Sequence, residues 1–100
     1  MRTYDIKDTE GRVFAFEISN LFIGRRSVSR LVRKIPGVKI LRTPKLFSWF
    51  REEVFCEFEV AETVFHVWEP FGDNSRYWIG PEDGKWHPEI ELIKRTFSSR

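Results

Sequence analysis

The feature that most constrains the fold is a pair of alternating segments, residues 54–60 and 63–69, separated by Ala61-Glu62. In the first segment every second side chain is apolar, and two of the three positions between them are glutamate. A period of two is typical of β-strands, because successive side chains of a strand point to opposite faces. The two segments therefore predict an antiparallel hairpin whose turn is centred on Ala61-Glu62.

This turn also predicts the register of the hairpin, since a one-residue slip would move every side chain to the other face. We expect the face that contains Phe58 to lie against the core, because its side chains are uniformly apolar. The opposed pairs are then Cys56–Val67 and Phe58–Phe65 on the core face, with Glu57–His66 and Phe55–Trp68 on the other.

Two helices are predicted. In residues 21–35 the apolar side chains recur at about 100° per residue, which is typical of an amphipathic helix. Asn20 can cap this helix, its regular part is expected from about Arg25, and Pro36-Gly37 ends it. A second helix starts near Pro88. Its apolar stripe consists of Trp86, Ile90, Ile93 and Phe97.

The other strands follow from turn residues and alternation. Residues 2–18 predict a hairpin around a turn at 8–11, and residues 38–41 and 76–80 predict two further strands. The order ββα-βββ(β)-α indicates an α+β two-layer sandwich, a mainly antiparallel sheet of about five or six strands with both helices on one face. We expect one domain over residues 1–100 and a loop at 43–51, whereas the order of the strands in the sheet stays open.

Charge is sorted along the chain. Residues 18–51 contain nine lysines and arginines and no acid, whereas residues 52–91 contain eleven acids and only two bases. An asymmetry of this kind suggests a charged partner without naming one. On the first helix the cations share one side, from which they could follow a nucleic-acid backbone. This candidate interface consists of Arg26, Arg30, Arg33 and Lys34, with Lys39, Arg42 and Lys45 as possible additions.

A second candidate surface is the sheet face that the helices leave open. Aromatic side chains on such a face would be exposed and could bind a protein partner, a second copy of the chain, bases or sugars. The alternative is that the 43–51 loop folds over them as a small second core. The residues expected there are Phe55, Trp68, Tyr77 and His66, with Trp49 from the loop.

Metal, cofactor and catalytic sites find no support in the sequence. Cys56, His66 and His87 lack the paired spacing of zinc ligands, and strand alternation places Cys56 and His66 on opposite faces. No nucleophile motif is present, and a core cysteine would be an inert thiol. Two weaker candidate sites remain, and both contain carboxylates. They are the pair Glu57 and Glu59, and a small-ligand site of Glu69, Asp73 and Arg76.

The sequence does not determine a function. We expect a small soluble non-enzymatic domain that binds a protein partner or itself, with nucleic-acid binding through the first helix as the alternative. A small-ligand or enzymatic site around Glu57, His66 and Tyr77 is a third alternative. The single cysteine suits a reducing cytosol, and the longest uncharged stretch, residues 18–24, is too short to span a membrane.

Overall fold

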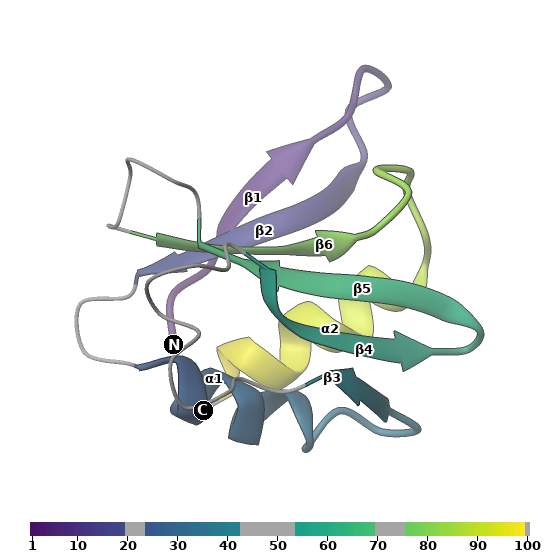
Figure 1. The fold of residues 1–100 in the computed structure, drawn as a ribbon. Helices are drawn as coiled ribbons and strands as arrows, with labels where there is room; N and C mark the ends of the chain where they lie inside the picture. The colour runs from purple at the N-terminus through teal and green to yellow at the C-terminus, as the bar shows by residue number, and fades with distance from the viewer. Residues whose placement is uncertain (20–23, 43–53, 70–75, 100) are drawn as a thin grey trace.

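The computed structural model describes residues 1–19, 24–42, 54–69 and 76–99. In these residues six antiparallel strands form one curved sheet, and two helices cover one face of it (Figure 1). The predicted α+β two-layer sandwich is therefore confirmed. Its elements are β1 (Tyr4–Lys7), β2 (Val13–Ser19), α1 (Arg25–Val32), β3 (Lys39–Arg42), β4 (Val54–Val60), β5 (Thr63–Trp68), β6 (Arg76–Pro81) and α2 (Glu89–Ser98).

The strand order across the sheet is β1-β2-β6-β5-β4-β3. The N-terminal hairpin therefore joins the sheet through β6, and the strand predicted at 38–41 forms the opposite edge beside β4. The two termini lie close together beneath the sheet (Figure 1), where the amino group of Met1 donates a hydrogen bond of 3.1 Å to the carbonyl oxygen of Ser98.

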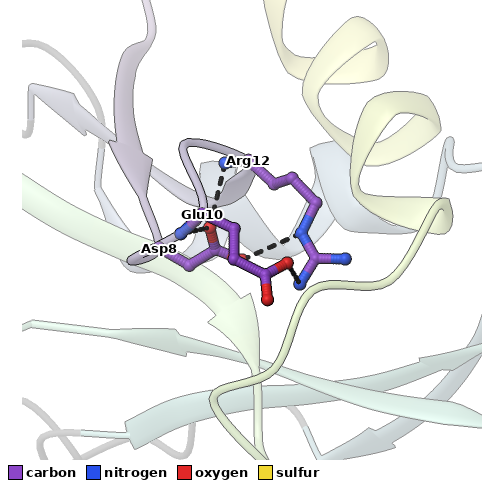
Figure 2. A network of polar contacts seen from close by, with 3 residues as sticks. All are labelled: Asp8, Glu10 and Arg12. Atoms are coloured by element: carbon purple, nitrogen blue, oxygen red, sulfur yellow. Dashed lines mark hydrogen bonds and ion pairs between the residues drawn. The ribbon is translucent and has the colours of Figure 1, made fainter.

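The turn between β1 and β2 is held by the carboxylate of Asp8 (Figure 2). One oxygen of Asp8 accepts hydrogen bonds of 2.9 Å from the backbone N–H groups of Glu10 and Arg12, and the other accepts 3.2 Å from Nε of Arg12. These bonds, led by that from the Arg12 backbone, lower the pKa of the Asp8 carboxyl below 3.8. The turn predicted at residues 8–11 is therefore present, and Gly11 supplies its positive φ of 81°.

The β4–β5 hairpin has the predicted register over its central part. Glu57 lies opposite His66 and Phe58 lies opposite Phe65, and the turn residues Ala61 and Glu62 both have positive φ, as a two-residue hairpin turn requires. The hydrophobic alternation of β4 was thus sufficient to predict both the turn and the face that packs on the helices.

The start of β4 departs from the prediction because it contains a β-bulge between Val54 and Cys56. Val54, and not Phe55, lies opposite Trp68. A bulge adds one residue to a strand and breaks its two-residue period. Phe55 and Cys56 are therefore both fully buried although they are adjacent in the chain.

Both helices bury one apolar stripe against the sheet. α1 begins at Arg25, where the regular helix was predicted to start, with Gly24 as its N-cap residue, while residue 20 lies outside the described residues. α2 begins at Glu89, so Trp86 precedes the helix and is 37% exposed instead of belonging to its stripe. Arg12 lies 5.1 Å from the centre of the Trp86 ring. The buried helix residues are Val28, Ser29, Leu31 and Val32 on α1 and Ile90, Ile93 and Phe97 on α2.

Candidate functional site

The outer face of α1 and the turn at its C-terminal end carry four exposed cations, as the sequence predicted. The helix buries the opposite stripe, so these side chains point to solvent. None of the four forms an ion pair within the part of the chain that the structure describes. We call this set the α1 basic face, and its members are Arg26, Arg30, Arg33 and Lys34.

The other cations of the same basic block lie elsewhere. Arg25 is paired with Glu69 at the end of β5, with Nε and Nη2 at 3.0 and 2.7 Å from one carboxylate oxygen. On β3, Lys39 is registered opposite Glu59 and Arg42 opposite Glu57, so both belong to the β3–β4 ladder. The α1 basic face is therefore the part of the block that gathers on one helix in the described residues, while Lys45 and Arg51 lie outside them.

Of the α1 basic face, only Arg26 lies in the first turn of the helix, whereas Arg30 lies in the last turn, where the helix dipole favours a cation. No acidic residue occupies the first turn of α1, where Arg25 and Arg26 lie. The N-terminal end of a helix carries partial positive charge, so a cation there is unfavourable by a few tenths of a kcal/mol to about 1 kcal/mol. Arg25 is compensated by Glu69, whereas Arg26 gains no such contact among the described residues.

The open sheet face carries a row of side chains that crosses five strands. Tyr4 on β1 and Trp78 on β6 flank Glu17 on β2, and the row continues to Trp68 and Val54. The indole rings of Trp68 and Trp78 meet edge to face with centroids 5.9 Å apart. The row is half-buried and contains an aromatic surface of the kind that the sequence predicted, with partly different members.

Two of the aromatic residues predicted on the open face lie in the core instead. Phe55 is fully buried and Tyr77 is 4% exposed, and their rings meet edge to face at 5.3 Å on the side of the helices. The bulge turns Phe55 inward, and the register of β6 places Tyr77 beside Ile79 in the core and exposes Trp78 on the other face. Trp68 and His66 are on the open face as expected, while Trp49 lies outside the described residues.

Three potential ligand groups meet on the open face beside this row. Glu57 and His66 face each other across β4 and β5, as predicted, and Glu82 joins them from just beyond β6. Sequence spacing missed Glu82 because the three residues come from separate segments of the sheet. The pairing of β5 with β6 would have indicated that Glu82 lies beside His66. Cys56 is buried in the core, away from the group, and His87 instead contacts Asp83 at 2.9 Å.

The predicted small-ligand group of Glu69, Asp73 and Arg76 is not assembled within the described residues. Glu69 binds Arg25 beneath the sheet, whereas Arg76 contacts Glu17 at 3.3 Å on the open face and lies 3.7 Å from the Tyr4 ring centre. Asp73 lies outside the described residues. Glu57 and Glu59 share the open face through their pairing with His66 and Val64.

The phenol of Tyr77 has a raised pKa, and this predicts a pH dependence of stability. Burial is the main cause and the negative charge of Glu69 adds to it, while Arg25 opposes it. Because the folded protein holds this proton above the ordinary pKa of 10.0, the contribution is complete below pH 10 and is lost as the pH rises further. Urea unfolding between pH 9 and 11 should show a steeper alkaline loss of stability for the wild type than for Tyr77→Phe. Equal losses in the two proteins would contradict a raised pKa of Tyr77. Tyr4→Phe is the control variant.

Comparison with known protein families, with curated proteins and with solved structures gives no significant match to this chain. Among the described residues, neither helix is long and apolar enough to cross a membrane. The inference of function therefore depends on the surfaces described above.

Proposed function

We propose that this protein is a non-enzymatic binding domain that contacts the phosphate backbone of nucleic acid through the α1 basic face. The observation that carries the proposal is the set of four exposed cations without ion pairs in the described part of the chain. Four other cations in that part are paired with carboxylates, as Arg12–Asp8, Arg25–Glu69, Arg76–Glu17 and Lys94–Asp5.

The dimensions of the α1 basic face suit a phosphate backbone. From Arg26 to Arg33, the C-cap of α1, the chain extends about 10 Å at a helical rise of 1.5 Å per residue, the axial length of about three phosphates on one strand. Cations at phosphates position a protein on nucleic acid without reading its sequence, so we expect little sequence preference. The proposal places the protein in the cytosol, in keeping with a single cysteine, which cannot form an internal disulfide.

The proposal predicts that Arg26→Gln/Arg30→Gln weakens binding to a mixed-sequence oligonucleotide. Losing two phosphate contacts should reduce affinity by at least about tenfold near 0.1 M salt, because phosphate contacts provide most of non-specific affinity. Fluorescence anisotropy with single- and double-stranded probes measures the effect. A matched control is Lys7→Gln/Lys85→Gln, which removes the same charge from exposed residues of β1 and the β6–α2 connection.

Equal weakening by both double variants would show that net charge, and not the α1 basic face, is responsible. Absence of binding by the wild type at low salt would contradict the proposal outright.

The second candidate function is binding of a protein partner or of a second copy on the open face. It is favoured by the row containing Trp68 and Trp78. Salt-insensitive dimerisation together with no oligonucleotide binding would favour that candidate.

A further inference from the structure

Glu57, His66 and Glu82 form a convergent group on the open sheet face. One ligand atom of each residue lies within 4.8 Å of one ligand atom of both others. Nε2 of His66 is 3.5 Å from Oε2 of Glu82. The group lies on the face that both helices leave open, so it is separate from the α1 basic face and does not depend on the proposed function (Figure 1).

Backbone pairing holds Glu57 and His66 opposite each other and positions Glu82 next to them. Glu57 and His66 are directly opposed in the β4–β5 ladder, so their Cβ atoms are held about 5 Å apart. The N–H of Glu82 donates a hydrogen bond of 2.9 Å to the carbonyl oxygen of Val64, which extends the β5–β6 pairing by one residue. Glu82 is therefore held beside β5, and its carboxylate reaches the His66 ring.

The donor set matches the preferences of zinc. Zn²⁺ binds imidazole nitrogen and carboxylate oxygen at about 2.0–2.2 Å, and three protein ligands plus one water are a common arrangement. Two tetrahedral ligands at these distances are about 3.4 Å apart, close to the 3.5 Å between His66 and Glu82. Glu57 needs to approach by little more than 1 Å for the same separation, starting from at most 4.8 Å. Two carboxylates would also neutralise the charge of the ion.

We propose that Glu57, His66 and Glu82 bind one divalent metal ion, with Zn²⁺ as the best match, and that water occupies its remaining coordination position. Solvent access is consistent with this, because Glu82 is exposed and the side chain of His66 is 22% exposed. The site would be a metal centre at the surface of the sheet, built by three segments that are distant in the sequence.

The test is a titration of the full chain, first treated with chelator, with ZnCl₂ in an isothermal calorimeter. We expect one ion per chain, and at least about tenfold weaker binding for Glu82→Gln and His66→Asn, since even groups that only orient metal ligands contribute tenfold or more. His87→Asn is the matched control, because His87 and Asp83 form the other histidine–carboxylate pair in the described residues.

A second readout separates direct ligation from a change in folding. In a long-range ¹H–¹⁵N spectrum, Zn²⁺ should shift the ring nitrogens of His66 and leave those of His87 in place. No binding, a stoichiometry other than one, or loss of binding in His87→Asn but not in His66→Asn would overturn the proposal. Glu82 is exposed, so Glu82→Gln is expected to fold normally, and circular dichroism checks this.

Discussion

Gly80→Ala is expected to destabilise the protein by about 2–3 kcal/mol, the upper part of the usual range for overpacking a well-packed site. Gly80 lies on β6 between β2 and β5, and the indole ring of Trp78 covers it. A Cβ at this position would lie 2.5 Å from Cη2 of Trp78 and 2.7 Å from Cβ of Ala15. The ring could move, but the Ala15 Cβ is fixed to the backbone of β2, so part of the clash cannot be relieved. Urea unfolding monitored by tryptophan fluorescence measures the loss.

A double-mutant cycle with Trp78→Ala tests the cause of this loss. If the indole ring provides most of the clash, Gly80→Ala should cost less in the Trp78→Ala background by about 1 kcal/mol or more. An unchanged cost would contradict the packing described for Gly80. Gly24→Ser is a second control, because the space around Gly24 is open and serine is a good N-cap residue, so we expect little change or a slight gain in stability.

Glu69→Ala is expected to cost about 2–3 kcal/mol of folding free energy, because it leaves the Arg25 guanidinium largely buried without its anion. The two side chains are only 13% and 19% exposed, and Arg25 also lies 4.7 Å from the centre of the Phe55 ring. The pair connects the first residue of α1 with the end of β5, so its loss should also loosen the start of the helix. Chemical unfolding gives the cost, and amide exchange in α1 reports on the helix.

The matched control is Asp5→Asn, which breaks the more exposed pair between Asp5 and Lys94 on the surface. Exposed ion pairs usually contribute less than about 1 kcal/mol, so this change should be small. Replacing both partners as Arg25→Met/Glu69→Leu should cost less than Glu69→Ala alone, since no charge then remains buried. A double variant that is less stable than Glu69→Ala would show that the ion pair is itself a net source of stability.

Much of the architecture could be predicted because hydrophobic alternation and turn residues agree. The hairpin around Ala61-Glu62 and the turn at Asp8 are both where the sequence placed them. Each depends on local chemistry, since alternation identifies the core face and a short acidic side chain can hold a turn through backbone N–H groups. The strand order depends instead on contacts between distant segments, and no local pattern contains it.

The candidate sites show the same division between local and distant contacts. The α1 basic face could be predicted because a helical period alone defines which side chains share its outer surface. Phe55 and Tyr77 were predicted to lie together and do, but on the core side of the sheet. An unpredicted bulge turns Phe55 inward, and the segment Arg76–Pro81 is apolar enough on both faces that alternation does not distinguish Tyr77 from Trp78.

The distribution of charge is also clearer in three dimensions than along the chain. Part of the basic block is registered against glutamates of β4, and Arg25 is paired with Glu69. Within the described residues, the α1 basic face lies on the opposite side of the sheet from Glu57, His66 and Glu82. The two proposals therefore concern separate faces and can fail independently.

The salt dependence of oligonucleotide binding is the sharpest test of nucleic-acid binding through the α1 basic face. If the four cations of the α1 basic face each neutralise one phosphate, the logarithm of the association constant should fall with the logarithm of salt concentration with a slope of about −3 to −4 for duplex DNA. Replacing all four by glutamine should reduce this slope to near zero, while Lys7→Gln/Lys85→Gln should leave it unchanged. A wild-type slope near zero, or the same slope in the fourfold variant, would contradict nucleic-acid binding through α1.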